Sequence, residues 1–463
     1  VDNSCRFNSG DNCKISRTSP NSSPTNAKKF TISFWVKRSN IDADSGHQYQ
    51  QIFTTNDNSG APFQEFQMYF TDNKLRLQIY NGSNKMELIT NRLFRDTSAW
   101  YSIIFSYDST PSTPSASSVR LWINGVLETS FSTAVYPSQN TDGEFAIQNH
   151  IQIIGNIVAN SRDLGGYLAE VIGVDGQALV NTDFGEFDED SGIFKPIDVS
   201  GIDVGTLGFY LDFEDSSALG NDVSGVGDFT LANLAAIDQS TDTCTNNFAT
   251  LNPLNNLGSN IAYSDGNLTI TPGTSDYKTC ISTIAVGSGK WYAEFKAVSG
   301  HNGSTDVSIG IVGADTFLAS TGSKAMSAYT NAFSYGSGGL VKQYNNSTIR
   351  TDATYTNDNI IGIAVDMDNL KLYWSKDGAF QNSGDPTSGA TGTGAVAITP
   401  AQLYYIAVAT ISSGGVKVFS ANFGSPPYSE SGGETDGDGY GNFAHAVPSG
   451  YFALCTKNLA EYG

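Results

Sequence analysis

Two short runs of carboxylates are the residues in this sequence best suited to chemistry. The first, residues 186–190, reads Glu-Phe-Asp-Glu-Asp. A retaining glycosidase holds two carboxyl groups about 5–5.5 Å apart, and a strand with the alternating pattern Glu-x-Asp-x-Glu can do so. Here the last position is Asp190, and glycines at 185 and 192 flank the run. We therefore expect an acidic surface loop and no catalytic pair.

The second run lies near the C-terminal end, in a glycine-rich stretch. Glu434, Asp436 and Asp438 alternate with small residues there. Calcium takes six to eight oxygen ligands and accepts flexible loops, so these three carboxylates form a candidate metal site. No Glu stands at the twelfth position of an EF-hand pattern, which favours a solvated loop instead. Calcium is the one cofactor for which the sequence offers a candidate site.

The remaining residue types that carry catalysis are widely separated. The histidines are His47, His150, His301 and His445, and no pair has zinc-binding spacing. No Gly-x-Ser-x-Gly nucleophile elbow occurs either. The sequence therefore predicts a protein that is not an enzyme.

Aromatic and amide side chains in turn-rich stretches suit binding better. A sugar ring stacks on tyrosine, while amides bond its hydroxyl groups. Tyr344 and Asn345 lie in Gln-Tyr-Asn-Asn, and His301 and Asn302 follow a predicted strand. Tyr335 ends a short aromatic run, where packing in the core is an equal alternative. These five residues are the predicted ligand-binding set.

Alternation with a period of two residues predicts that the elements carrying these residues are strands. Apolar and polar residues alternate in short runs separated by Gly, Asn, Asp, Ser and Pro, and helical periodicity is nearly absent. The five tryptophans lie inside such runs, which predicts that they anchor the core. In the first half the predicted strands cover residues 29–37, 65–70, 74–80, 100–107, 119–127, 151–155 and 166–174.

Four motifs in the first half resemble the laminin-G-like, concanavalin-A-like lectin fold. They are the strand at 29–37 with Phe-Thr-Ile-Ser-Phe-Trp-Val, the Trp-Tyr strand at 100–107, the hairpin dipeptide Asn124-Gly125, and Gly-Tyr-Leu-Ala-Glu-Val at 166–171. The resemblance covers about residues 1–235. It implies an antiparallel jelly-roll sandwich, a fold that often holds calcium.

Five segments of the second half resemble SPRY domains, which bind ligands through loops. Residues 360–378 read as strand, turn, strand, turn, like the central hairpin of that family. The other segments are 289–295, 307–312, 332–335 and 416–424, the last ending in Asn-Phe-Gly. The family shares a scaffold and not a ligand.

Together these patterns predict an all-β chain of two antiparallel β-sandwiches. A polar, turn-rich stretch at residues 236–262 lacks strand periodicity. We therefore predict a concanavalin-A-like domain at 1–235, a linker at 236–262 and a SPRY-like domain at 263–463.

Composition excludes several classes of protein. The 463 residues carry a net charge of −21, which argues against nucleic-acid binding because phosphate contacts need basic side chains. No run approaches the roughly 18 apolar residues of a membrane span, so no membrane insertion is expected. The five cysteines include no Cys-x-x-Cys pair, and free, mostly buried thiols are expected; Cys5 and Cys13 are the only locally plausible bridge.

The resemblance extends over nearly the whole chain when further segments are included. Residues 183–196, 208–222 and 242–254, with the two ends of the chain, resemble fibre-like virion proteins of marine tailed bacteriophages. This implies a non-enzymatic virion protein, a fibre or decoration, that forms a homo-oligomer, contacts other virion subunits and attaches to a host surface glycan. The alternatives are a polysaccharide-degrading spike enzyme and a purely architectural capsid or tail subunit.

Overall fold

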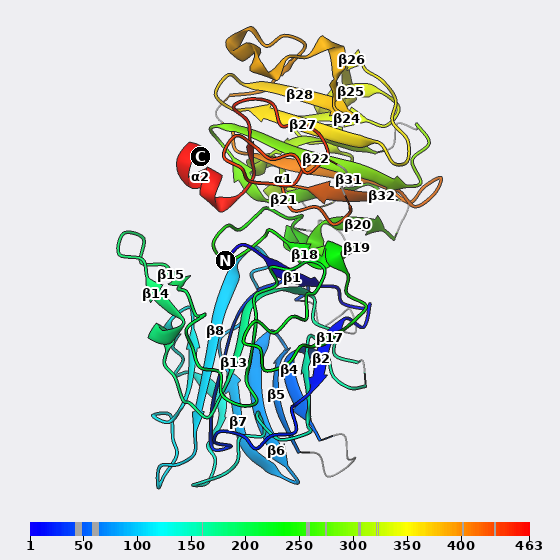
Figure 1. Ribbon diagram of the computed structural model, residues 1–463. Helices are drawn as coiled ribbons and strands as arrows, with labels where there is room; N and C mark the ends of the chain where they lie inside the picture. The colour runs from blue at the N-terminus through cyan, green and yellow to red at the C-terminus, as the bar shows by residue number, and fades with distance from the viewer. Residues whose placement is uncertain are drawn as a thin grey trace. The chain divides into compact units, whose positions relative to one another are not determined.

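The computed structural model describes residues 1–41, 49–57, 64–159, 161–255, 260–273, 276–303, 307–320, 322, 324–400, 402–429 and 432–463. Strands make up 43% of the residues and helices 9%, which confirms the all-β class. The chain divides into two compact units, Val1–Thr245 and Asn246–Gly463. Figure 1 shows the strands of both units coloured along the chain.

The first unit is a sandwich of two antiparallel sheets. One sheet has the order β10-β9-β8-β3-β13-β1-β18, with β16 also paired to β13, and the other has the order β11-β7-β6-β5-β4-β12-β2-β17. A separate hairpin joins β14 to β15. The strands are β1 (Ser4–Phe7), β2 (Lys14–Thr18), β3 (Lys29–Arg38), β4 (Tyr49–Asn56), β5 (Gln64–Thr71), β6 (Lys74–Asn81), β7 (Asn84–Thr90), β8 (Trp100–Asp108), β9 (Val119–Ile123), β10 (Val126–Leu127), β11 (Phe131–Val135), β12 (Ile151–Ile154), β13 (Gly166–Asp175), β14 (Gly185–Phe187), β15 (Phe194–Pro196), β16 (Phe209–Leu211), β17 (Thr230–Ala232) and β18 (Gln239–Ser240), with 3-10 turns η2 (Asn181–Asp183) and η3 (Ala236–Asp238).

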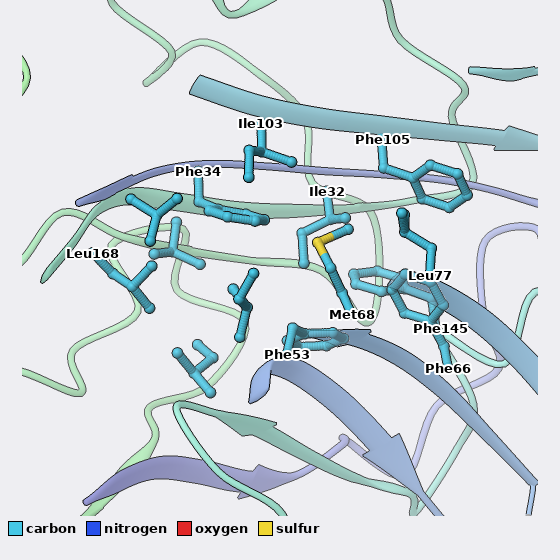
Figure 2. Packing of buried hydrophobic residues seen from close by; sticks show 14 of the residues in the cluster. Ile32, Phe34, Phe53, Phe66, Met68, Leu77, Ile103, Phe105, Phe145 and Leu168 are labelled. Atoms are coloured by element: carbon cyan, nitrogen blue, oxygen red, sulfur yellow. The ribbon is translucent and has the colours of Figure 1, made fainter. Parts of the chain in front are cut away.

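Alternation along the strands builds the core between these two sheets. On β3, Ile32 and Phe34 point inward, where they meet Phe53 and Met68 of the facing sheet (Figure 2). All four side chains are buried. Because successive side chains of a strand point to opposite faces, Trp35 lies on the other face of β3.

That outward face of the first sheet is covered as well. Trp35, Trp100 and Trp122 are buried there against Phe184, Phe194 and other side chains of the segment that follows β13. Both faces of the sheet are therefore apolar. The tryptophans anchor a second cluster outside the sandwich core, in agreement with their predicted role as anchors.

The second unit is also a two-sheet sandwich. Its sheets have the orders β19-β20-β32-β22-β27-β28-β29, with β30 on β28 and β33 parallel to β22, and β21-β31-β23-β24-β25-β26. The elements are η4 (Pro253–Asn255), β19 (Ile261–Ser264), η5 (Asp265–Asn267), β20 (Thr269–Pro272), β21 (Lys278–Val286), β22 (Lys290–Ser299), β23 (Ser308–Gly313), α1 (Ala314–Leu318), η6 (Met326–Ala328), β24 (Ala332–Gly336), β25 (Leu340–Gln343), η7 (Tyr344–Asn346), β26 (Ser347–Thr351), β27 (Ile360–Asp366), β28 (Lys371–Lys376), β29 (Ala379–Phe380), η8 (Gln381–Ser383), η9 (Pro386–Thr391), β30 (Val396–Ala397), β31 (Tyr404–Thr410), β32 (Val418–Asn422), β33 (Phe452–Ala453) and α2 (Thr456–Tyr462).

The hairpin read from residues 360–378 forms as predicted. Strand β27 pairs with β28 in the register Asp366↔Lys371, and β28 pairs with β29 across the two-residue turn Asp377-Gly378. Both turn residues have positive φ, 49° and 80°, which Asp and Gly tolerate. Trp374 is buried and donates from its indole to the carbonyl of Ile309 at 3.1 Å.

The boundary between the two units falls within residues 236–262, the stretch that the sequence predicts as a linker. Its first part folds into the first unit, where β18 pairs with β1 and the Asp242 side chain is buried. Its later part folds into the second unit, where Phe248 and Leu251 are buried. Some polar side chains of this stretch, such as Asp242, are therefore buried and hydrogen-bonded.

All five cysteines are free thiols. Burial raises the pKa of Cys13 and Cys455 to about 11 and that of Cys280 to about 12. Since the thiolate is the reactive form, these three thiols are chemically inert near neutral pH. In the described part of the chain, none of the helices has the length and apolar character needed to cross a membrane.

Candidate ligand-binding site

A cavity of about 540 Å³ lies within the first unit, over the outward face of its first sheet. Pockets that hold small ligands typically measure about 300–1,000 Å³, so this cavity is of ligand size. It is lined by Ile172, Asp198, Val199, Ser200, Ile202, Asp203, Val204, Gly205, Tyr210, Asp212, Glu214, Val223, Ser224 and Val226.

The floor of the cavity comes from two paired strands. Strand β16 pairs with β13 in the register Ile172↔Tyr210, and both side chains line the cavity. Strand β13 carries a bulge at Glu170, whose φ is 51°. A bulge turns a side chain from its regular direction. The phenol of Tyr210 donates to Glu170 Oε2 at 2.7 Å, so the bulge fixes the ring.

Short turns hold the acidic walls. Asp198 Oδ1 accepts from the Ser200 amide at 2.9 Å, and Asp203 Oδ1 accepts from the Gly205 amide at 3.0 Å. Asp212 Oδ1 accepts from the amide of Glu214 at 3.1 Å. In each aspartate one carboxylate oxygen is thus committed to the backbone. Within the described residues, the second oxygens of Asp203 and Asp212 accept no hydrogen bond, so each can accept one from a ligand.

The electrostatics of the cavity are strongly negative. Asp198, Asp203, Asp212 and Glu214 line it, and in the described residues none of the four forms an ion pair. The lining includes no Lys, Arg or His. Hydrogen bonds from Ser200 hold the pKa of Asp198 below its usual range. At neutral pH this carboxylate is therefore an acceptor only, suited to hydroxyl or ammonium donors.

Burial changes the titration of the pair on the floor. It raises the pKa of Glu170 above that of a free glutamate, although the hydrogen bond from Tyr210 opposes the shift. Burial and the nearby Glu170 carboxylate raise the pKa of Tyr210 well above its usual value. The tyrosine consequently stays a neutral phenol that donates a hydrogen bond to Glu170.

Sequence reasoning did not find this cavity. Its carboxylates come from separate stretches, near 198–203 and near 212–214, and an apolar wall comes from 223–226. Acidic residues near an aromatic residue are common on protein surfaces, so the sequence around Tyr210 does not by itself indicate a binding site. The pairing of β13 with β16 joins Ile172 to Tyr210, and backbone bonds from Asp175 to Val204 and from Val223 to Tyr210 bring in the other stretches.

Two of the predicted ligand-binding residues are buried in the second unit. The Tyr335 ring is fully buried against Tyr355 and Trp374, and its phenol donates to the carbonyl of Ala353. His301 is 4% exposed and its ring lies 4.4 Å from that of Phe419. Neither ring offers a free face to a sugar, and the structure places both in the core of the second unit.

The other three predicted residues are exposed but do not form one site. Asn302 pairs with Thr356 in an isolated antiparallel β-bridge. The neighbouring Tyr355 donates its backbone N–H to the carbonyl of Ser337, which follows the end of β24. Tyr344 and Asn345 follow Gln343, which pairs with Phe333 near the start of β24. The register therefore places Asn302 and the Tyr344–Asn346 turn at opposite ends of β24.

A small groove lies beside the Tyr344–Asn346 turn. It is lined by Tyr277, Ser308, Ala325, Ser327, Ser334, Gly336, Leu340, Lys342, Asn346 and Ala409, and its volume is about 50 Å³. A water molecule occupies about 30 Å³ of liquid, so the groove cannot enclose a sugar ring. It can serve only as the polar edge of a surface site.

We expect Tyr344→Ala to leave the second unit as stable as before, because the Tyr344 side chain is 51% exposed. If the turn contacts a glycan, the same change should weaken binding by about 1–2 kcal/mol through loss of a stacked ring. Thermal unfolding and glycan titration measure the two effects. A large fall in the unfolding temperature would place Tyr344 in the core.

The predicted calcium ligands do not gather around a common point. In the described part of the chain, no three His, Cys, Asp or Glu side chains form a group that could hold a metal ion. Asp436 is buried and both its oxygens accept from N–H donors, whereas Glu434 and Asp438 are exposed. The donor set does not fit calcium, and Asp436 instead holds its own loop together.

The acidic run at 186–190 forms an exposed hairpin rather than a cleft. Strands β14 and β15 pair in the register Glu186↔Lys195. Lys195 Nζ lies 3.4 Å from Glu186 Oε1 and 3.3 Å from Asp188 Oδ2. Hydrogen bonds from Ser191 hold the pKa of Asp188 at about 2. A carboxylate this acidic cannot act as a general acid. The run is exposed as expected, although its first residues form strand β14 instead of a loop.

Comparisons with known proteins support the architecture of the first unit. Residues 8–172 match a family model described as the concanavalin A-like lectin/glucanases superfamily. No curated protein matches the chain.

Several solved structures are similar to this chain at low identity. The SPRY domain of human HERC1 is 14% identical to this chain, and the match has a TM-score of 0.30. It covers 37% of this chain and 96% of the HERC1 domain. Domains LG4-5 of the mouse laminin alpha1 chain are 11% identical, with coverages of 88% and 81% and a TM-score of 0.29. A SAP-like pentraxin from Limulus polyphemus is 14% identical, with coverages of 39% and 78% and a TM-score of 0.27. At such TM-scores these likenesses carry no argument about function. Residues 8–172 of the first unit are thus similar to the concanavalin A-like lectin/glucanases superfamily.

Proposed function

We propose that this protein is a non-enzymatic, glycan-binding virion subunit, a fibre or decoration that attaches to a host surface glycan. The observation that carries the proposal of glycan binding is the 540 Å³ cavity of the first unit. The same unit contains the residues that match the concanavalin A-like family model. The cavity combines the Tyr210 ring and an aliphatic wall with several hydrogen-bond acceptors.

The chemistry of the cavity suits a saccharide. The apolar face of a sugar ring can pack on Tyr210 and on Ile172 or Val226, while its hydroxyl groups donate to Asp203 and Asp212. The phenol of Tyr210 is already engaged with Glu170, so the ring is held in place before a ligand arrives. Such preorganisation lowers the entropic cost of binding.

The absence of catalysis is part of the proposal. The acidic run departs from the alternating glycosidase pattern at Asp190, and its hairpin is exposed. Incubation with host-envelope polysaccharides should release no new reducing ends. Release that Glu186→Gln abolishes would support the alternative of a polysaccharide-degrading spike.

The virion role and the homo-oligomeric state rest on the resemblance of the sequence to fibre-like phage proteins. A density map of the particle tests both, since it would show this chain at a tail tip, a vertex or a capsid face. Absence of the chain from purified particles would contradict the virion role and leave glycan binding intact.

We expect Tyr210→Ala to weaken glycan binding by about 1–2 kcal/mol, because it removes the ring that a sugar stacks on. Tyr210→Phe keeps the ring and should retain most of the affinity. Glycan arrays followed by calorimetry with the best ligand measure the effect. Tyr80→Ala, on β6 and outside the cavity lining, is the matched control. Equal losses in Tyr210→Ala and Tyr80→Ala would contradict binding in the cavity.

A further inference from the structure

A second constellation lies on the outward face of the other sheet of the first unit. Phe66, Met68 and Phe70 of β5 point into the core, so Gln67 and Tyr69 lie on the opposite face. The register continues across the sheet, because Gln51 of β4 and Arg76 of β6 both pair with Tyr69.

Arg162 lies over this face and is fixed at both ends. The backbone carbonyl of Arg162 accepts from the backbone N–H of Gln51 at 2.9 Å. The backbone N–H of Arg162 donates to Asn156 Oδ1 at 3.1 Å. The guanidinium carbon lies 5.0 Å from the ring centroid of Tyr49 and 5.2 Å from that of Tyr69. Two ring contacts hold a guanidinium in a defined plane.

Within the described residues, only the Nη1 nitrogen of this guanidinium donates hydrogen bonds. Nη1 donates to Gln67 Oε1 at 2.9 Å and, more weakly, to Gln51 Oε1 at 3.5 Å. Nε and Nη2 donate to none of the described residues, and no described carboxylate pairs with Arg162. The Nε–Nη2 edge is the fork that binds a carboxylate or sulfate with two parallel bonds.

The neighbouring arginine shows the contrast. Arg76 also lies over the Tyr69 ring, at 5.6 Å, but its guanidinium pairs with Glu87. Among the described residues Arg162, like Arg38 and Arg120, forms no ion pair with a carboxylate. Arg162 therefore presents a positive, oriented donor pair on a face that also carries neutral Gln67 and Tyr69 and the Arg76–Glu87 ion pair.

We propose that Arg162 binds the oxyanion group of an acidic saccharide, a uronate carboxylate or a sulfate ester. The Tyr49 side chain is 37% exposed and can stack a sugar ring beside the charged group. This aromatic surface favours a saccharide over an acidic peptide. The site is separate from the Tyr210 cavity, whose acidic lining would repel such a ligand.

The test is biolayer interferometry of the full chain on immobilised alginate, dextran sulfate, neutral dextran and poly-L-glutamate, at low and high salt. We expect binding to alginate, to dextran sulfate or to both, which distinguishes carboxylate from sulfate, and none to dextran. Arg162→Gln should weaken binding at least tenfold. Arg162→Lys should weaken it several-fold, because lysine keeps the charge but loses the fork.

The control is Arg95→Gln, which removes the same charge from another exposed position and should change affinity less than twofold. Tyr210→Ala should leave this binding unchanged, so failure here is distinguishable from failure of the cavity proposal. The inference is overturned if neither acidic polysaccharide binds, if Arg95→Gln loses as much affinity as Arg162→Gln, or if poly-L-glutamate binds as tightly.

Discussion

Replacing Asp242 with alanine should lower the free energy of unfolding of the first unit by about 3–5 kcal/mol, since it breaks a buried ion pair. Asp242 Oδ2 lies 2.6 Å from Lys37 Nζ, and each side chain is only 1% exposed. Asp242 Oδ1 also accepts from the Trp100 indole at 3.0 Å. Without this carboxylate, the buried Lys37 ammonium loses the charge that compensates its removal from water.

A matched surface pair provides the control. Lys28 and Asp142 form an ion pair at 3.2 Å, but their side chains are 37% and 49% exposed. Asp142→Ala should therefore cost less than about 1 kcal/mol. Urea denaturation of the full chain, followed by fluorescence, measures both variants. Similar midpoints for the two variants would show that Asp242 is dispensable and that the first unit ends before it, as the sequence had predicted.

Replacing Asp436 with alanine should destabilise the second unit by about 2–4 kcal/mol, because four donors would lose a charged acceptor. Its Oδ1 accepts from the amides of Asp438 and Tyr440 at 3.0 and 2.9 Å. Its Oδ2 accepts from the Ala453 amide at 2.9 Å and from Asn458 Nδ2 at 2.8 Å. One carboxylate thus ties its loop to β33 and α2.

The same variant separates this role from calcium binding. If Asp436 serves the loop, the melting temperature of the wild-type protein should be equal in EDTA and in millimolar calcium. Asp438→Ala, at an exposed position of the same loop, should change stability by less than about 1 kcal/mol. A rise in melting temperature with calcium that Asp436→Ala and Asp438→Ala both abolish would restore the metal site.

The sequence alone determined the elements that depend on local pattern. Alternation and turn chemistry suffice for the hairpin at 360–378, because side-chain direction in a strand has a period of two and Asp377-Gly378 tolerates positive φ. The burial of Trp35 and Trp374 followed from the same alternation. These features are set by neighbours in the chain, so the all-β class and the two sandwiches were predictable.

Only the tertiary structure decided which polar residues are buried and which residues meet. Asp242 and Asp436 look like solvated loop residues in the sequence, yet each satisfies donors that come from more than 15 positions away. Tyr335 was equally compatible with a loop or a core, and its contacts with Trp374 put it in the core. Burial of a polar group depends on distant partners, which periodicity does not encode.

The candidate sites are tertiary for the same reason. The cavity joins Ile172 to Tyr210 through the pairing of β13 with β16. The Arg162 site joins a loop to strands β4 and β5, more than 90 positions earlier in the chain. Neither grouping leaves a spacing motif, because strand order in a sandwich brings together residues that are far apart in sequence. The sequence thus determined the scaffold, and the packing of its sheets decided where a ligand can bind.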